Sequence, residues 1–147
     1  MAIADDLPHW GPGTVAILST GAGAPHAIPV STGVRAGPQR ILIALSQRRE
    51  SLARLRVDPR AALTLLTAGN VAFTAHCRAE IVADPLPGIE GVVALALTVE
   101  HVQDHGRPEF HIEEPVRWRW TDPDAASRDE QVRAALHALA QCMTDGR

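Results

Sequence analysis

The sequence predicts a mainly β fold in which six or seven short antiparallel strands close into a barrel accompanied by two helices. Three observations favour this fold class. Short segments rich in apolar and β-branched residues follow one another, with Gly- and Pro-containing turns between them. Helical periodicity occurs only in one short segment and near the end of the chain. The strand–helix alternation of a doubly wound sheet is missing, which favours a barrel.

Each element has its own signal in the chain. The helix expected over about 47–57 carries Leu52 and Leu55 on one face and is ended by Pro59. A second, amphipathic helix is expected over 124–143. The first two strands are predicted to form a hairpin because a Gly-rich turn joins them. In chain order, the expected strands are residues 14–20, 25–32, 40–45, 60–67, 71–82, 92–102 and 115–121.

Size and charge limit the function classes. With 147 residues, we expect a single domain over 1–147 that is large enough to bury a core. A hydrophobic fraction of 46% and a charged fraction of 21% are typical of globular proteins. The net charge of −3 argues against a general nucleic-acid or anionic-membrane binder. All 14 basic residues are arginine, so no lysine can serve as a Schiff base or general base.

The cysteines and the N-terminal segment indicate a cytoplasmic protein. Cys77 and Cys142 lie far apart and form neither a disulfide framework nor a CxxC motif. The first 13 residues are acidic and interrupted by Pro and Gly, unlike a signal peptide. No apolar run approaches the ~20 residues of a membrane span. We therefore expect no membrane and no nucleic-acid partner.

A candidate anion site follows the third predicted strand. Arg48 and Arg49 stand where a helix should begin, and helix starts already carry partial positive charge. Ser46 and Ser51 add hydroxyl groups near the free amides of the first turn. Guanidinium groups form charge-assisted hydrogen bonds with phosphate. The alternative is a solvated helix face, in which the arginines pair with Glu50 or Asp58.

The second predicted strand has an unusual pair of prolines. Pro25 and Pro29 lie four residues apart, which a strand tolerates only where their missing N–H groups need no partner. Such an open edge could offer its remaining main-chain groups to a flat heteroaromatic ring. The alternative is an edge strand protected against aggregation.

Three segments in a fixed order carry a family resemblance. They read GTVAILST, then GAPHAIPVS, then RILIALSQRRESLARLRVDPRAAL, within residues 13–82. Their order and spacing resemble the pyridoxamine 5′-phosphate oxidase-like family of flavin-binding split β-barrels, with a looser similarity at 116–122. The resemblance implies a homodimeric split barrel. It also implies that FMN, or the deazaflavin coenzyme F(420), lies in a groove between the subunits.

The resemblance also assigns site residues. Pro29, Val30 and Ser31 would run along the isoalloxazine ring of the cofactor. The cofactor phosphate would be held by Ser46, Arg48, Arg49 and Ser51. The chain departs from the family pattern because Ser51 stands where many relatives have lysine, and because the loop at 84–91 is short. Phosphate binding would then rest on arginine alone, or the cofactor would differ or be absent.

Tryptophans near the C-terminus permit two interpretations. In the predicted strand at 115–121, Trp118 and Trp120 share one face and Arg119 lies on the other. Both indoles could belong to the core or to a dimer interface. Alternatively, one indole edges the cofactor of the neighbouring subunit and Arg119 meets its anionic groups. No metal site is expected, because His101 and His105 would lie about 13 Å apart on a strand.

The resemblance implies a flavin- or deazaflavin-dependent oxidoreductase that transfers hydride between the cofactor and an unidentified small molecule. The cofactor would supply the reactive chemistry, and no catalytic acid–base pair is identified in the sequence. A non-catalytic carrier or sensor of flavin or deazaflavin is the alternative. A third hypothesis is a homodimer that has lost its cofactor.

Overall fold

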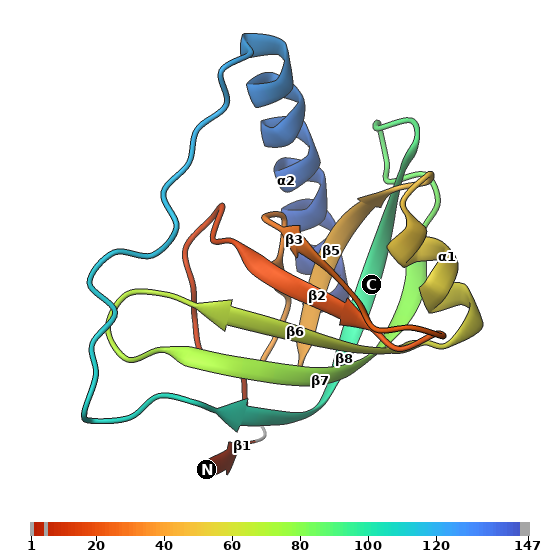
Figure 1. Ribbon diagram of the computed structural model, residues 1–147. Coiled ribbons are helices and arrows are strands. Elements are labelled where there is room, and N and C mark those ends of the chain that lie inside the picture. The colour runs from red at the N-terminus through yellow and green to blue at the C-terminus, as the bar shows by residue number, and fades with distance from the viewer. Residues whose placement is uncertain (1, 5, 145–147) are drawn as a thin grey trace.

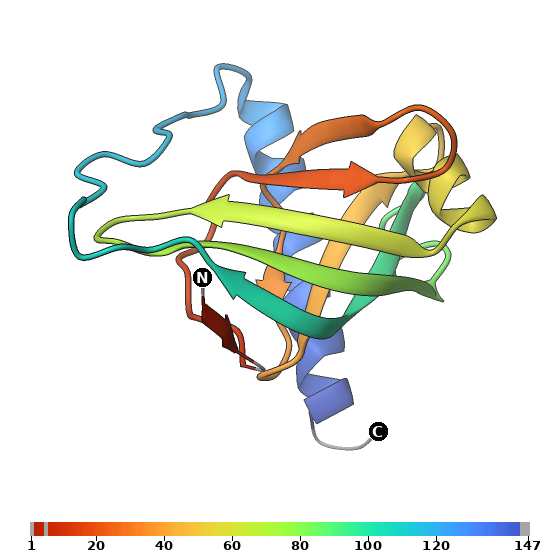
Figure 2. The same cartoon turned by 60° about the horizontal axis from the view of Figure 1, so that its bottom comes forward.

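In the computed structural model, residues 2–4 and 6–144 are described, and they form one curled antiparallel sheet with two helices (Figures 1 and 2). The sheet order is β3-β2-β6-β7-β8-β5-β4, and β1 pairs with the end of β8. The predicted mainly β split barrel is confirmed. The strands are β1 (Ala2–Ala4), β2 (Ala16–Thr20), β3 (His26–Val30), β4 (Val34–Arg35), β5 (Arg40–Ser46), β6 (Arg60–Leu66), β7 (Ala72–Ala83) and β8 (Val92–Asp104).

The two helices take different positions on the barrel. Helix α1 (Glu50–Val57) follows β5 and lies at one end of the barrel, beside β2 and β3. Helix α2 (Pro123–Thr144) crosses the outer face of the sheet over β4 and β5 (Figure 1). Both helices were predicted, with α2 matching closely and α1 beginning three residues later than expected. The delay has a local cause, since Arg49 is still extended with φ −67° and ψ 135°.

Six of the seven predicted strands are present as β2, β3, β5, β6, β7 and β8. The strand predicted at 115–121 is wrong: residues 105–122 connect β8 to α2 without forming a strand or helix. An alternating pattern gives a strand only where a sheet edge is free to pair with it. Both edges of β8, the strand that precedes this segment, are already occupied by β7, β5 and β1, and residues 115–121 pair with no other described strand.

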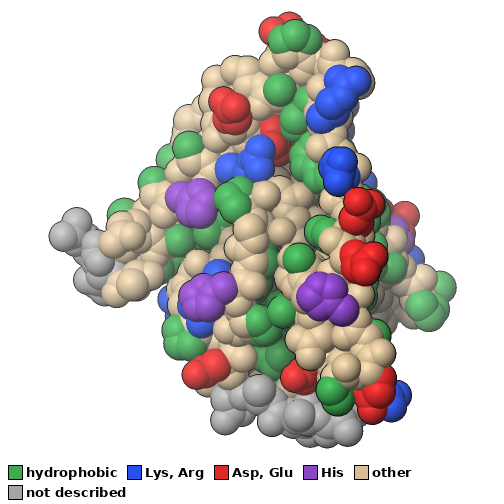
Figure 3. All heavy atoms as spheres, turned by 90° about the vertical axis from the view of Figure 1, so that its left-hand side faces the viewer, with side chains coloured by type: hydrophobic (Ala, Val, Ile, Leu, Met, Phe, Trp, Pro, Cys, Tyr) green, Lys and Arg blue, Asp and Glu red, His purple; other side chains and the backbone are tan. Residues whose placement is uncertain are grey.

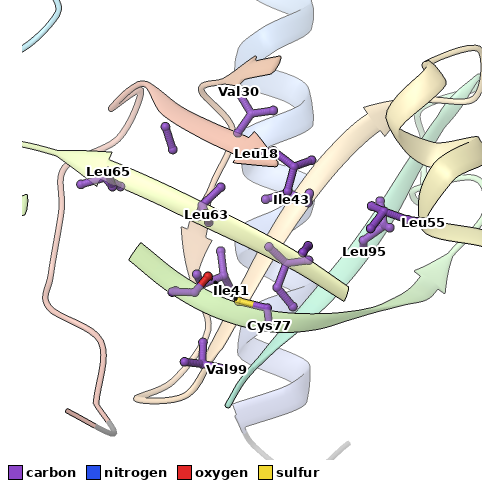
Figure 4. Close-up of a cluster of buried hydrophobic side chains, with 14 of the residues drawn as sticks. Leu18, Val30, Ile41, Ile43, Leu55, Leu63, Leu65, Cys77, Leu95 and Val99 are labelled. Carbon is purple, nitrogen blue, oxygen red and sulfur yellow. Dashed lines mark hydrogen bonds between the residues drawn. The ribbon is translucent and has the colours of Figure 1, made fainter. Parts of the chain in front are cut away.

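Strands β5 and β8 are buried on both faces, which accounts for their nearly continuous apolar sequences. Ile41 and Ile43 of β5 point into the barrel, together with Leu95 of β8 (Figure 4). The intervening Leu42 and Ala94 face outward and pack beneath α2. The protein therefore has an inner core within the barrel and an outer core between the sheet and α2.

The barrel is split between β3 and β5, and one side chain spans the gap. The hydroxyl of Thr32 donates to the carbonyl oxygen of Ala44 at 3.4 Å and accepts from the Ala44 amide at 3.3 Å. These two contacts replace a strand ladder at this position, because β3 is hydrogen-bonded only to β2. The position of β3 at the sheet edge also explains how Pro29 is tolerated within it.

No helix within residues 2–4 and 6–144 is both long and apolar enough to cross a lipid bilayer.

Candidate functional site

The turn between β5 and α1 presents two arginines at the surface. The Arg48 amide donates to the Ser46 hydroxyl at 3.3 Å, and the Arg49 amide donates to the Ser46 carbonyl at 3.0 Å. Arg49 is the N-cap of α1 but makes no side-chain capping bond. The turn is also held by Gln47, whose backbone amide donates to the backbone carbonyl of Gly91 at 2.9 Å. The start of α1 thus keeps amides and two cations available to an anion.

The acidic residues that could neutralise these arginines are paired elsewhere. Glu50 contacts Arg54 at 2.8 Å and His26 at 3.3 Å, and the hydrogen bond from Arg54 lowers the pKa of the Glu50 carboxyl. Asp58 forms its ion pair with Arg60 at 2.8 Å. The expected pairing of Arg48 and Arg49 with Glu50 or Asp58 is therefore not found. Neither guanidinium has a hydrogen-bond or ion-pair partner among the described residues.

A cavity of about 230 Å³ opens beside this turn, between the outer face of β5, the start of β8 and the first half of α2. Ala44, Val92 and Val132 give it apolar walls, and the Trp120 indole borders it. Ser46 lines the cavity as well as bonding the Arg48 amide, so the cavity and the arginine turn adjoin. The full lining comprises Thr32, Ala44, Ser46, Val92, Trp120, Ala125, Arg128, Asp129 and Val132.

The charged residues of the cavity both come from α2. The Asp129 side chain is only 7% exposed, and Arg133 Nη2 lies 2.6 Å from its Oδ2. The two residues lie one turn apart on α2 and form an ion pair. Arg128 donates through Nη2 to the Glu90 carbonyl at 3.1 Å. One buried carboxylate and one partly engaged guanidinium therefore line an otherwise apolar space.

The connecting segment 105–122, named the strap here, brings Trp120 to the cavity. Trp118 donates its indole N–H to the Gly13 carbonyl at 2.9 Å, and the two tryptophan rings meet edge to face with centroids 5.4 Å apart. Arg119 is exposed between them. On the face that carries the strap, hydrophobic, basic, acidic and histidine side chains are interspersed rather than gathered by type (Figure 3).

The residues expected along a flavin ring are divided between two environments. Pro29 is exposed on β3, whereas Val30 is buried inside the barrel at 7% exposure. Ser31 is half-buried, and the next residue, Thr32, lines the cavity. The open edge of β3 thus leads directly to the cavity.

Ser51 lies apart from the other expected phosphate ligands. Its side chain is fully buried, and its hydroxyl has no hydrogen-bond partner in the described part of the chain. Two further buried polar atoms near α1 also lack partners, Thr20 Oγ1 and His26 Nε2. Thr20 and His26 are cross-strand neighbours on β2 and β3, at the barrel end beside α1. The structure therefore brings Ser46, Arg48 and Arg49 together, but not Ser51.

Sequence reasoning missed Thr32, Arg128 and Asp129. The α2 residues that line the cavity are 125, 128, 129 and 132, a spacing of three, four and seven residues that marks one helix face. In the sequence, Arg128 and Asp129 are the polar residues of this helix face. The pattern became informative only once α2 was seen to lie over β5.

Comparisons with solved structures identify the architecture. A candidate pyridoxamine 5′-phosphate oxidase from Lactobacillus delbrueckii superposes with a TM-score of 0.54 at 18% identity, covering 62% of this chain and 84% of that chain. An F(420) reductase gives a TM-score of 0.54 at 13% identity, with 63% and 90% covered. The chain has the pyridoxamine 5′-phosphate oxidase-like split-barrel fold.

One structurally similar protein is described by a different ligand. A heme-binding protein from Mycobacterium smegmatis is similar with a TM-score of 0.55 at 18% identity, covering 71% of this chain and 53% of that chain. No protein-family model and no curated protein sequence matches this chain. The split-barrel fold alone therefore leaves the ligand to be argued from the site.

Proposed function

We propose that this protein is a flavin-binding oxidoreductase of the pyridoxamine 5′-phosphate oxidase-like family. In this proposal it transfers hydride between FMN, or the deazaflavin coenzyme F(420), and a small molecule. One observation carries the proposal: two arginines whose guanidinium groups have no partner among the described residues adjoin an apolar cavity through a shared residue, Ser46. The split-barrel fold and the F(420) reductase among its neighbours support a flavin-type ligand.

The arginine turn fits a phosphate group. Arg48 and Arg49 would supply guanidinium donors to phosphate oxygens, and the uncapped start of α1 would add amide donors. Because neither arginine has to leave an internal ion pair, binding would cost no existing contact. The Ser46 hydroxyl, already at this turn, is a further candidate donor.

The cavity fits part of a planar ring. Ligand pockets usually enclose about 300–1,000 Å³, whereas this cavity encloses about 230 Å³ and opens to the surface. A tricyclic ring would therefore enter with one end and leave the remainder along Pro29 and Ser31 at the edge of β3. We propose that a second copy of the chain covers that remainder in a homodimer. The exposed Val116, Trp118 and Trp120 support this arrangement.

The protein residues would bind and orient the cofactor rather than react with substrate. When bound, a flavin or deazaflavin supplies the hydride acceptor or donor. Ala44, Val92 and Val132 would exclude water from the enclosed end of the ring. Arg48 and Arg49 would fix the phosphate and thereby the position of the ring. A non-catalytic flavin carrier would need the same residues, so turnover must be measured.

A haem ligand is less well supported than a flavin by the residues that line the cavity. None of the described residues that line the cavity is histidine, cysteine, methionine or tyrosine, the usual axial ligands of haem iron.

The two cysteines are free, with Cys77 buried and Cys142 exposed. Free thiols suit the reducing cytoplasm, which we propose as the location of the protein.

The test begins with an absorption spectrum and mass spectrometry of whatever copurifies with the protein. Fluorescence titration with FMN and F(420) should then give saturable binding that is abolished or greatly weakened in Arg48→Ala/Arg49→Ala. The charge-matched control is Arg78→Ala/Arg107→Ala, which removes two exposed arginines from other parts of the surface. Equal affinity in the two double variants would contradict the phosphate assignment.

Catalysis is tested separately by anaerobic mixing of the loaded protein with reduced nicotinamide or reduced deazaflavin. Rapid oxidation or reduction of the chromophore is expected of an enzyme. A tightly bound chromophore that does not react would indicate the carrier. A colourless protein that binds neither compound would overturn the proposed function.

A further inference from the structure

We propose that Asp129 is a ligand-binding residue that accepts a hydrogen bond from an N–H group on the lactam or imide edge of a planar heterocycle. This inference rests on the proposed function, because the pyrimidine-dione end of a flavin or deazaflavin carries such an edge. It assigns the orientation of the ring: the pyrimidine end enters the cavity beneath α2, and the phosphate end points toward α1.

The first step is the unsatisfied state of the carboxylate. Asp129 lies within the outer core region with a side chain 7% exposed, yet no described residue donates a hydrogen bond to it. Arg133 pairs with Oδ2 at 2.6 Å, so the oxygen left for a ligand is Oδ1, which has no partner among the described residues. Buried carboxylates are normally hydrogen-bonded, so a buried one without a donor calls for an explanation. A donor supplied by a ligand is the explanation that the cavity favours.

The second step is the position of Asp129 in the cavity wall. Asp129 and Arg128 are adjacent on α2 and both line the cavity. Arg128 uses Nη2 for the Glu90 carbonyl, and a guanidinium has five N–H groups, so donors remain. A carboxylate acceptor beside a guanidinium donor complements an edge on which N–H and C=O groups alternate. A purely apolar ligand would offer neither group a further hydrogen-bond partner.

The third step is the shape of the space. Ala44 and Val92 lie on the sheet side of the cavity, Val132 on the helix side, and the Trp120 indole borders it. Apolar walls and an indole suit a flat aromatic ring. The cavity therefore favours a planar heterocycle over a flexible polar chain.

The fourth step connects the two ends of the ligand. Ser46 lines the cavity, and Arg48 follows only two residues later. Two residues span at most about 7 Å of chain, so the arginines begin close to the cavity mouth. A ligand with a heterocycle at one end and a phosphate at the other can reach both places. Its orientation is then fixed by Asp129 at the buried end.

The experiment compares FMN with 3-methyl-FMN, in which the imide N–H is replaced by N–CH₃. Wild-type protein should bind FMN about ten- to a hundredfold more tightly, the range for a hydrogen bond to a charged group. Asp129→Ala should lose this preference and bind the two compounds with similar dissociation constants. Asp124→Ala, an exposed acidic residue in the first turn of the same helix, should retain the wild-type preference.

A second variant protects the test against misfolding. Asp129→Ala leaves Arg133 without its ion-pair partner, which can destabilise the protein. Asp129→Leu combined with Arg133→Met removes both charges and should fold, again without preference between the two flavins. Circular dichroism and thermal melting confirm folding before each titration.

The outcomes separate the two proposals. If wild-type protein binds FMN but shows no preference over 3-methyl-FMN, the Asp129 assignment is overturned and the flavin proposal survives. Retained preference in a folded Asp129 variant has the same meaning, because another group would then recognise the imide N–H. If the wild-type protein binds neither FMN nor F(420), both proposals fail together.

Discussion

The indole N–H of Trp118 donates to the carbonyl oxygen of Gly13 at 2.9 Å, across 105 positions of sequence. This bond joins the strap to the segment that precedes β2. The Trp118 ring in turn packs edge to face with the ring of Trp120, and the Trp120 indole borders the cavity. A contact far from the arginine turn therefore holds one wall of the candidate site.

Trp118→Phe tests this connection. Phenylalanine keeps an aromatic ring against Trp120 but cannot donate to Gly13, and the lost hydrogen bond should cost about 1 kcal/mol of stability. We expect greater acrylamide quenching of the remaining tryptophan fluorescence and weaker flavin binding. Unchanged flavin affinity in the folded variant would mean that the wall does not depend on this anchor.

Ser51→Ala should leave flavin affinity unchanged and should stabilise the fold by about 1 kcal/mol. The Ser51 hydroxyl is buried without a partner, and alanine is the better helix former. Thermal melting and FMN titration measure the two effects. Ser46→Ala, at the exposed arginine turn, is the comparison and should weaken binding. A large loss of FMN affinity in Ser51→Ala would restore Ser51 as a phosphate ligand.

Gly106→Ala should destabilise the protein by about 1–3 kcal/mol, the range for overpacking. A Cβ atom at this position would meet the main-chain carbonyl of Asn70, which cannot move aside as a flexible side chain can. Gly11→Ala is the matched control, because nothing lies within 4 Å of its added Cβ and its φ is ordinary. Denaturant melts should separate the two variants. Equal midpoints would show that the chain near Gly106 adjusts freely.

The Asp58–Arg60 pair should contribute to acid sensitivity. The hydrogen bond from Arg60 lowers the pKa of Asp58 from 3.8 to about 2. A carboxyl whose pKa is lower in the folded state stabilises the fold above its unfolded pKa, and this stabilisation disappears as the pH falls toward the folded pKa. Asp58→Asn should therefore flatten the pH dependence of unfolding between about pH 4 and pH 2. High salt should weaken the effect, because the pair lies at the surface.

The two cysteines should differ in reactivity. Burial raises the pKa of the Cys77 thiol to about 12, and the nearby Glu100 carboxylate adds to the increase. Cys142 is exposed on α2. Ellman's reagent should therefore titrate one thiol per native chain and two after denaturation. Rapid reaction of both thiols in the native protein would indicate that β7 opens readily.

The sequence was a good guide to elements whose signal is local. The alternation in β2 and β3, the apolar run of β5 and the Pro59 stop of α1 each reflect short-range constraints. The strand predicted at 115–121 failed because pairing depends on a free sheet edge elsewhere in the molecule. The two shortest strands, β1 and β4, are too brief to produce a recognisable pattern.

The candidate site was also predictable only where its residues are neighbours in sequence. Ser46, Arg48 and Arg49 are neighbours in sequence, so their proximity followed from the chain itself. Asp129 could not be connected with Ala44 from sequence, because their place in one cavity depends on where α2 docks on the sheet. Ser51 was proposed from its place in the first turn as well as by resemblance, and its burial could not be inferred from the sequence.

The position of α2 after all the strands of the barrel also affects how the protein matures on the ribosome. Leu42, Ala94 and Ala96 form an apolar stripe on the outside of β5 and β8, and residues of α2 cover it. Because synthesis proceeds from the N-terminus, the strands emerge first and this stripe stays uncovered until the helix follows. The nascent barrel is therefore most vulnerable to aggregation, and most in need of chaperone protection, after its strands and before α2 have been made.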